Sequence, residues 1–105
     1  MIGIDIEDIG RFAQQPYSTH ISFYQKIFTP AEIAYCLAKT DPYPHFAVRF
    51  CAKEAFIKAI RKKQIDLIDI EVIKVDDQPF VVWQNTRYTA SLSHERDKAV
   101  AVIVI

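Results

Sequence analysis

The sequence predicts an α+β fold: a small single domain in which an antiparallel sheet packs against a central helix. Three observations carry this prediction. Residues 46–61 keep a helical period without Gly or Pro, and residues 1–7 alternate as a strand does. From residue 68 onward the period is strand-like again. A chain of 105 residues, half of them hydrophobic, suits one core, so residues 1–105 are expected to form one domain.

The first expected strand, residues 1–7, has two chemically different sides. One side carries Ile2, Ile4 and Ile6, and the other carries Gly3, Asp5 and Glu7. The aliphatic side is expected to be buried. Two carboxylates on the other side need a reason, because strands are depleted in Asp and Glu. Either that side faces solvent, or the carboxylates hold a divalent cation, which prefers oxygen ligands.

The segment between the first strand and the central helix is expected to hold short helices and loops. Residues 8–28 fit a short helix or turn, a loop and a partly buried apolar stretch. A helix is predicted to begin after Thr29, because Thr29 can cap it, Pro30 suits its first turn and Glu32 completes a capping box. A loop with two prolines is expected over residues 39–45.

The central helix, residues 46–61, is predicted to combine an apolar side with several charges. The apolar side is rich in small residues: Val48, Cys51, Ala52, Ala55, Phe56 and Ala59. Glu54 and Lys58 lie one turn apart, and the simplest interpretation is a surface ion pair. The basic residues around them are Arg49, Lys53, Lys58, Arg61, Lys62 and Lys63. They indicate either an anionic partner or a solvated basic face.

The C-terminal part is predicted to be a series of strands joined by short connections. Strands are expected over residues 68–75, 80–83, 87–92 and 99–105, with turns or loops at 76–79, 84–85 and 93–98. The last strand is apolar on both faces. Both faces should therefore be covered, and another subunit could provide one cover.

Composition excludes some functions and favours a compartment. The formal net charge is zero, which gives no support for nonspecific binding to nucleic acid or to a membrane. Cys36 and Cys51 have no metal-binding spacing, and Cys51 fits a small buried hydrophobic residue. The sequence shows no signal peptide and no apolar run long enough for a membrane span. We therefore expect a cytoplasmic protein with reduced thiols.

Three weak features become informative together: Asp5 with Glu7, Glu54 with Lys58, and Ser91-Leu92-Ser93-His94. A histidine near a strand end is usually structural or solvent-facing. Carboxylates from distant segments beside lysines, however, could hold Mg²⁺ and neutralise phosphate oxygens. The usual glycine-rich nucleotide cradles are absent from the sequence. The combination favours phosphoryl chemistry without a P-loop.

At these motifs the chain resembles a known family. The motifs are Gly3-Ile4-Asp5-Ile6-Glu7 with Arg11-Phe12, Phe28-Thr29-Pro30-Ala31-Glu32-Ile33, Arg49-Phe50-Cys51-Ala52-Lys53-Glu54-Ala55-Phe56-Ile57-Lys58-Ala59, and Ser91-Leu92-Ser93-His94. In this order they resemble the holo-acyl-carrier-protein synthases of the 4′-phosphopantetheinyl transferase superfamily. The resemblance implies that family's fold. It also implies Mg²⁺-dependent transfer of 4′-phosphopantetheine from coenzyme A to a serine of an apo acyl carrier protein, with release of adenosine 3′,5′-bisphosphate.

The resemblance also implies roles for individual residues. Asp5 and Glu54 would bind Mg²⁺, and Glu7 could add a third carboxylate. Lys58 would contact the transferring phosphate. The coenzyme A site would be lined by Arg49, Ser93 and His94, and Arg11 would meet the acidic helix of the carrier protein. The base for the serine proton stays open between Glu54, Glu7 and a metal-bound water.

Small members of the family resemble one another in being trimers with active sites across subunit boundaries, so a homotrimer is expected. One departure from the family is the absence of a Gly-rich turn in residues 60–64. An alternative function is a noncatalytic module that binds or assembles carrier proteins. A third is a different coenzyme A- or nucleotide-binding protein. The carrier itself could serve fatty-acid, polyketide or peptide synthesis.

Overall fold

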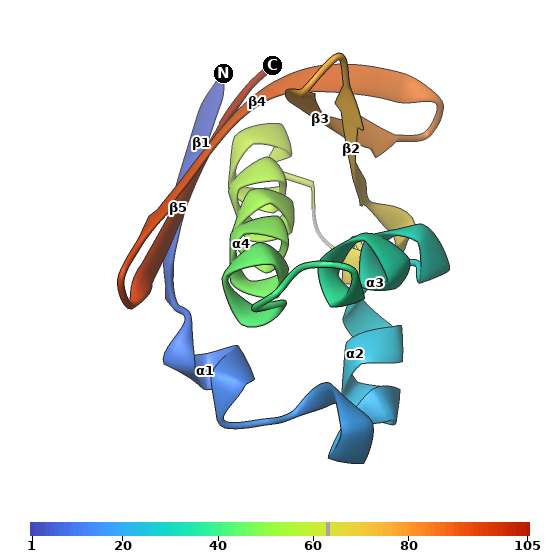
Figure 1. The fold of residues 1–105 in the computed structure, drawn as a ribbon. Coiled ribbons are helices and arrows are strands. Elements are labelled where there is room, and N and C mark those ends of the chain that lie inside the picture. The colour runs from blue at the N-terminus through green and yellow to red at the C-terminus, as the bar shows by residue number, and fades with distance from the viewer. Residues whose placement is uncertain (63) are drawn as a thin grey trace.

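One long helix lies against a curved antiparallel sheet, and the shorter helices gather at one end of both (Figure 1). This computed structural model describes residues 1–62 and 64–105. The elements in chain order are β1 (Ile2–Asp8), α1 (Gly10–Ala13), η1 (Tyr17–Thr19), α2 (Ile21–Ile27), α3 (Pro30–Leu37), α4 (Tyr43–Ile60), η2 (Leu67–Asp69), β2 (Glu71–Val75), β3 (Gln78–Trp83), β4 (Thr86–Glu95) and β5 (Lys98–Val104). The predicted α+β fold class is confirmed.

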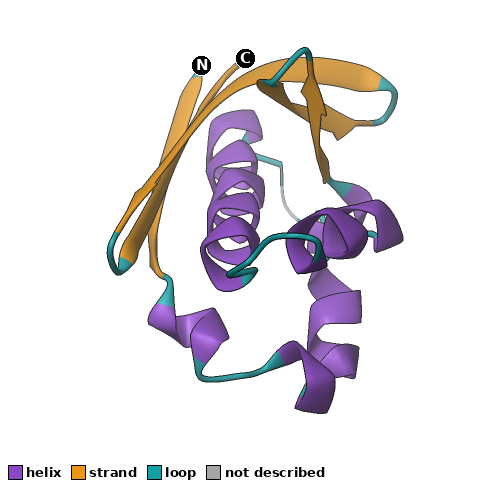
Figure 2. Ribbon diagram, viewed as in Figure 1, coloured by secondary structure: helices purple, strands orange, loops and turns teal. Residues whose placement is uncertain are grey.

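The sheet has five strands in the order β1-β5-β4-β3-β2, and each neighbouring pair is antiparallel. The first and last strands of the chain are therefore neighbours, and the two termini lie side by side (Figure 2). The Met1 ammonium donates a hydrogen bond to the Ile105 carbonyl at 2.7 Å. In the described part of the chain, no helix has the length and apolar character that crossing a membrane requires.

Strand β1 turns its small and acidic side, not its aliphatic side, toward α4. Gly3 is buried, whereas Ile2, Ile4 and Ile6 are 58–71% exposed. A Cβ at position 3 would lie 1.9 Å from the Ala55 carbonyl oxygen, so only glycine lets α4 lie this close to the strand. The expected burial of the aliphatic side is therefore wrong for the single chain. Strand alternation separates two sides but does not say which of them meets the helix.

Helix α4 begins earlier than predicted and ends where expected. It begins at Tyr43, so Pro44 lies in the first turn of the helix and not before it. Proline is tolerated in the first turn, because the backbone N–H groups there have no partner within the helix. It ends at Ile60, and Arg61 follows with φ 57°, the left-handed geometry that often ends helices. All six residues of the predicted apolar side are buried. Lys63, one of the basic residues noted after the helix, lies outside the described residues.

Strands β3 and β4 are longer than predicted, because the turns beside them are shorter, whereas β2 begins at Glu71 after η2 and not at residue 68. Two-residue turns at Asp76–Asp77 and Gln84–Asn85 have positive φ at both positions, as type I′ hairpin turns require. Strand β4 runs to Glu95, and β5 begins at Lys98. The prediction of a loop over residues 93–98 is wrong, because the polar residues 93–95 continue β4 as an exposed part of the strand. Ser93 and His94 are therefore strand residues.

A buried network joins α3, α4 and β2. The predicted capping box is confirmed, with Thr29 and Glu32 bonding each other's backbone. The Glu32 carboxylate also accepts from Lys53 Nζ at 2.7 Å and from the Val72 N–H at 2.7 Å. Lys53 is fully buried and donates to the Ile27 carbonyl as well. Lys53 is therefore not part of a solvated basic face, which corrects that interpretation of residues 49–63.

Candidate active site

Three predicted carboxylates face one another between β1 and α4. Because Asp5 and Glu7 occupy the side of β1 that meets the helix, they approach Glu54 on α4. Burial raises the pKa of Glu54, and the negative charges of Asp5 and Glu7 raise it further, against Lys58 and Arg11. The Oδ2 atom of Asp5 is buried and has no hydrogen-bond partner among the described residues. The site thus concentrates negative charge and contains one carboxylate oxygen, Asp5 Oδ2, that is free to accept a ligand.

Lys58 reaches from α4 to β1. Its Nζ lies 2.9 Å from Asp5 Oδ1 and 3.1 Å from the Ile4 carbonyl oxygen. The hydrogen bond to Asp5 raises the pKa of Lys58. The ion pair is therefore with Asp5 across the helix–strand contact, and the interpretation of Lys58 as the surface partner of Glu54 is wrong. Lys58 and Asp5 also line a pocket of about 390 Å³ with Ile4, Ile6 and Val100, here called the β1 pocket.

The donor set between β1 and α4 fits a hard cation of the Mg²⁺ type. Within residues 1–62 and 64–105, no three His, Cys, Asp or Glu side chains are placed together as metal ligands. Arg11 holds Glu7 at 2.8 Å, which leaves Asp5 and Glu54 as the available carboxylates. Mg²⁺ is commonly bound by one or two carboxylates together with substrate phosphates. The free oxygen of Asp5 and its carboxylate neighbour fit that pattern.

Arg49, Ser93 and His94 come together at a different place. They line a pocket of about 250 Å³, here called the β4 pocket, with Val48, Lys74, Asp77, Pro79 and Leu92. The His94 ring lies 5.8 Å from the ring of His45, at the first turn of α4. Arg49 and Lys58 are nine residues apart on one helix, about 13 Å along its axis. Within one chain, the predicted coenzyme A residues therefore lie in two regions: Arg49, Ser93 and His94 at the β4 pocket, and Lys58 at the β1 pocket.

Arg11 lies on the edge of the molecule beside the carboxylates. Its Nη1 donates to Glu7 at 2.8 Å, and its guanidinium carbon lies 4.8 Å from the centre of the Phe50 ring. The side chain is half exposed. It lines an open pocket of about 660 Å³ with Glu7, Asp8, Gly10, Gln14 and Asp97. The arginine is thus accessible to a partner.

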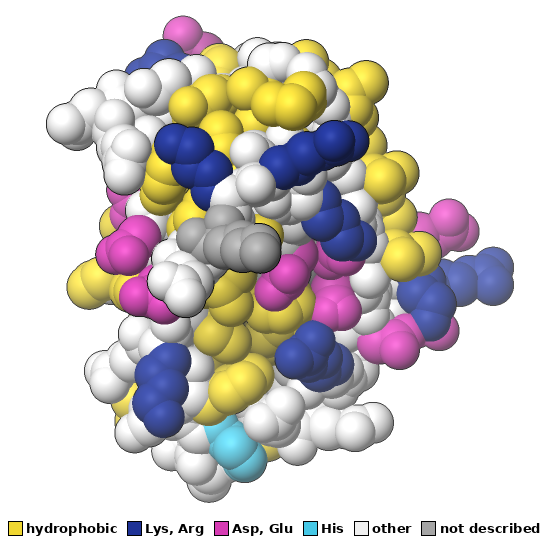
Figure 3. Space-filling model, turned by 180° about the vertical axis from the view of Figure 1, so that it is seen from behind, with side chains coloured by type: hydrophobic (Ala, Val, Ile, Leu, Met, Phe, Trp, Pro, Cys, Tyr) yellow, Lys and Arg dark blue, Asp and Glu magenta, His cyan; other side chains and the backbone are white. Residues whose placement is uncertain are grey.

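Sequence reasoning did not select several residues that line the β4 pocket. Lys74, Asp77 and Pro79 come from the β2–β3 hairpin, which the strand pairing brings beside α4. Nothing in their local sequence marks them, because their position depends on the fold of the whole sheet. In Figure 3, acidic side chains gather near the middle of one face with basic and hydrophobic ones around them, in keeping with zero net charge.

Comparisons with known proteins agree with this architecture. Residues 1–104 match the sequence model of the 4′-phosphopantetheinyl transferase superfamily. The chain is 37% identical over 108 residues to the holo-[acyl-carrier-protein] synthase of Thermodesulfovibrio yellowstonii, covering 99% of this chain and 96% of that protein. It is 39% identical over 114 residues to that of Chlamydia caviae, covering 98% and 93%. The crystal structure of the Helicobacter pylori holo-[acyl-carrier-protein] synthase in complex with coenzyme A superposes with a TM-score of 0.86 at 29% identity, covering 99% and 98%.

Fold, site and full-length relatives agree on the class of protein, a group-transfer enzyme. The chain belongs to the 4′-phosphopantetheinyl transferase superfamily. Its curated relatives at 37% and 39% identity carry the name holo-[acyl-carrier-protein] synthase. The family expected from the motifs is confirmed.

Proposed function

We propose that this chain transfers 4′-phosphopantetheine from coenzyme A to a serine hydroxyl of an apo acyl carrier protein, with adenosine 3′,5′-bisphosphate as the leaving product. The observation that carries the proposal is the meeting of Asp5, Glu54 and Lys58 between β1 and α4. Full-length relatives named for this activity support it. In the reaction the serine oxygen bonds to the β-phosphorus, and the bond from that phosphorus to the leaving bisphosphate breaks.

Asp5 and Glu54 would hold Mg²⁺, and Glu7 could add a third carboxylate. When bound, the ion supplies positive charge beside the phosphate oxygens. The support from this chain is the buried, unpartnered Oδ2 of Asp5 beside the carboxylate of Glu54. Arg11 already pairs with Glu7, so Glu7 is the less available ligand.

Lys58 would neutralise charge on the transferring phosphate. Its ammonium is exposed and reaches Asp5 from α4, so a small rotation about its long side chain would bring it to a phosphate in the β1 pocket. Phosphoryl transfer needs such positioning and charge stabilisation more than covalent help. The base that accepts the serine proton stays open between Glu54 and a metal-bound water, because Arg11 already pairs with Glu7.

The rest of coenzyme A would occupy the β4 pocket. Arg49 supplies a guanidinium, Lys74 an ammonium, and Ser93 and His94 hydrogen-bonding groups there. This arrangement matches an anionic, polar ligand. Arg11 would contact the acidic surface of the carrier protein, because it is exposed and lies next to the carboxylate site.

A homotrimer would join the two regions. The outer side of β1 and β5 is apolar, with Ile2 71%, Ile4 58%, Ile6 61% and Val104 49% exposed. An apolar face of this kind needs cover. If a neighbouring subunit packs there, its β4 pocket can meet this chain's β1 pocket. The active site would then lie across a subunit boundary, with Asp5 and Lys58 from one chain and Ser93 and His94 from the next.

Intact-protein mass spectrometry tests the function directly. An apo acyl carrier protein is incubated with this protein, coenzyme A and Mg²⁺, with and without a chelator. The expected result is a gain of one phosphopantetheine that the chelator abolishes. No gain with carriers from fatty-acid, polyketide and peptide synthesis would overturn the proposal in favour of a noncatalytic carrier-binding module.

A further inference from the structure

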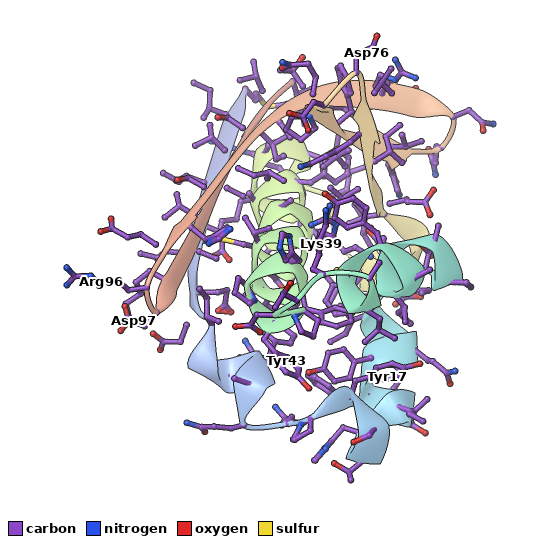
Figure 4. All side chains as sticks on the ribbon, viewed as in Figure 1. Tyr17, Lys39, Tyr43, Asp76, Arg96 and Asp97 are labelled. Atoms are coloured by element: carbon purple, nitrogen blue, oxygen red, sulfur yellow. The ribbon has the colours of Figure 1, made fainter. Side chains whose placement is uncertain are left out.

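Three cations surround the ring of Tyr35 on α3. The Arg49 guanidinium carbon lies 4.1 Å from the ring centre, Lys39 Nζ 4.6 Å and Lys74 Nζ 5.7 Å. They come from α4, from the segment after α3 and from β2. Figure 4 labels Lys39 where the chain between α3 and α4 passes close to both helices. One aromatic ring thus gathers positive charge from three separate parts of the chain.

The guanidinium of Arg49 depends on this ring for its placement. Arg49 is only 3% exposed, and its Nη1 donates to the His45 carbonyl at 3.2 Å. A buried guanidinium stacks well on an aromatic face, which attracts the charge and leaves the N–H groups at its edge free to bond. The Tyr35 ring and the His45 carbonyl are therefore two contacts that hold the Arg49 guanidinium in place.

The charge around Tyr35 is only partly balanced by nearby acids. Glu32 is engaged by Lys53. Glu71 lines the neighbouring pocket with Arg49 and Lys74 and keeps its negative charge, because its hydrogen-bond donor is the neutral Thr29 hydroxyl. Asp77 lies 3.8 Å from Lys74 but is almost fully exposed. The excess of cations over free carboxylates favours an anionic ligand.

The titration of neighbouring groups agrees with this charge. Burial lowers the pKa of His45, and Arg49, His94, Lys39 and Lys74 lower it further. Burial acts to raise the pKa of Tyr35, but Lys74 and Arg49 outweigh it and lower the value. Both shifts are those expected where cations crowd together.

Tyr35 touches these cations from outside the β4 pocket. Arg49 and Lys74 line the β4 pocket, and they also line a neighbouring pocket of about 180 Å³. Tyr35 lines the neighbouring pocket but not the β4 pocket. The ring can therefore influence a ligand in the β4 pocket through the two cations, without contact of its own.

We propose that Tyr35 is a positioning residue for coenzyme A, whose ring holds Arg49 and Lys74 at the β4 pocket. This inference rests on the proposed function, since it takes coenzyme A as the occupant of that pocket. Removing the ring should free the cations to separate, weakening their joint attraction for a phosphate. The chemistry at Asp5 and Lys58, which do not line the β4 pocket, should be unaffected.

The test compares Tyr35→Leu with Tyr35→Phe in the mass-spectrometric transfer assay. Tyr35→Leu is expected to raise KM for coenzyme A about tenfold with kcat within about twofold. Tyr35→Phe keeps the ring and should restore the wild-type KM to within about twofold. Equilibrium binding of coenzyme A should weaken in parallel. Because Arg49→Lys removes the planar guanidinium that contacts the ring, adding it to Tyr35→Leu should raise KM little further, as expected for residues that act together.

Phe80→Leu is the matched control. Phe80 also carries a cation, Arg87 at 4.9 Å, but does not line the β4 pocket. The KM of the Phe80→Leu protein for coenzyme A should stay at the wild-type value. An unchanged KM in a folded Tyr35→Leu protein would overturn the inference, as would an equal rise in Phe80→Leu. A wild-type protein without transfer activity would instead refute the proposed function.

Discussion

At position 3 the absence of a side chain decides whether β1 and α4 can touch. The strand carries Asp5 and the helix carries Glu54 and Lys58, so the active-site geometry depends on this contact. The obstacle to a Cβ is the Ala55 carbonyl, a backbone atom that cannot rotate away. Gly3 is therefore as important to the site as the charged residues that it allows to meet.

Gly3→Ala is expected to lower the free energy of unfolding by about 3 kcal/mol, at the upper end of the usual cost of overpacking, because the helix must move off the strand. Urea denaturation followed by circular dichroism measures this change. Gly10→Ala is the matched control, since a Cβ there meets only the end of the Gln14 side chain at 3.8 Å. Equal stability of Gly3→Ala and the wild type would contradict the close contact.

Glu54→Gln should abolish transfer and, in the absence of metal, stabilise the fold at neutral pH. Burial and two neighbouring carboxylates raise the pKa of Glu54 above its ordinary value of 4.5, so its ionised form disfavours the folded state. As pH rises through the interval above 4.5, the wild type should lose stability and the variant should not.

Thermal unfolding at several pH values measures the difference between Glu54→Gln and wild type. The Tm difference should be present at pH 7 and vanish near pH 3, where both states of Glu54 are protonated. Full transfer activity in Glu54→Gln would remove this residue from the mechanism. A Tm difference that grows as pH falls would contradict the cause given for the pKa shift.

At the scale of elements, one buried carboxylate joins three segments distant in sequence. Glu32 caps α3, accepts Lys53 from α4 and accepts the Val72 N–H from β2. A buried charge pair is not in itself a large source of stability, but removing one partner leaves the other unpaired. The network therefore fixes how the β2–β3 hairpin sits against α4, and with it the position of the β4 pocket.

Lys53→Met is expected to destabilise the protein by about 3–5 kcal/mol, because it leaves the Glu32 carboxylate buried without its cation. Burial lowers the pKa of Lys53, and the Glu32 carboxylate opposes that shift most strongly, with a smaller contribution from Glu71. Urea denaturation is the measurement. Lys62→Met, at an exposed position, should change stability by under about 0.5 kcal/mol. Similar effects of the two substitutions would show that the pair is dispensable.

Elements with a local cause could be predicted from sequence, and those set by distant packing could not. The Thr29 cap is local, and so is the turn at residues 84–85. The side that β1 turns to the helix was not predictable, because alternation alone is symmetric. Asp5, Glu54 and Lys58 were predicted as a site, and the structure brings them together. The role of Tyr35 was not predicted, because the three cations around its ring come from segments that meet only in the folded chain.

At the scale of the molecule, the exposed side of β1 and β5 is the feature that a single chain leaves unexplained. The strand register places Ile2 opposite Val104, Ile4 opposite Val102 and Ile6 opposite Val100, so the apolar side chains form a continuous ladder. Such a face on a protein of 12.1 kDa should drive self-association. In the proposed trimer, this face would bring the neighbouring subunit beside Asp5 and Lys58.

Ile4→Glu should break self-association, because it places a charge in the middle of this ladder. Light scattering coupled to size exclusion should give about three times the chain mass for the wild type and the mass of one chain for the variant. Ile21→Glu, at a residue 42% exposed on α2, is the control and should stay associated. A monomeric wild type, or an associated Ile4→Glu, would contradict the proposed trimer.

A site shared between subunits also predicts that two inactive variants can restore each other. Glu54→Gln removes the carboxylate region and His94→Ala the coenzyme A region, and each homotrimer should be inactive or strongly impaired. If Glu54 and His94 of one site come from neighbouring chains, random mixing leaves about a quarter of the sites with both wild-type residues. Refolding the two variants together should therefore recover about that fraction of activity, measured by mass spectrometry of the carrier protein. Mixed trimers without recovered activity would place both residues of each site in one chain, and the division between the β1 and β4 pockets would then need another cause.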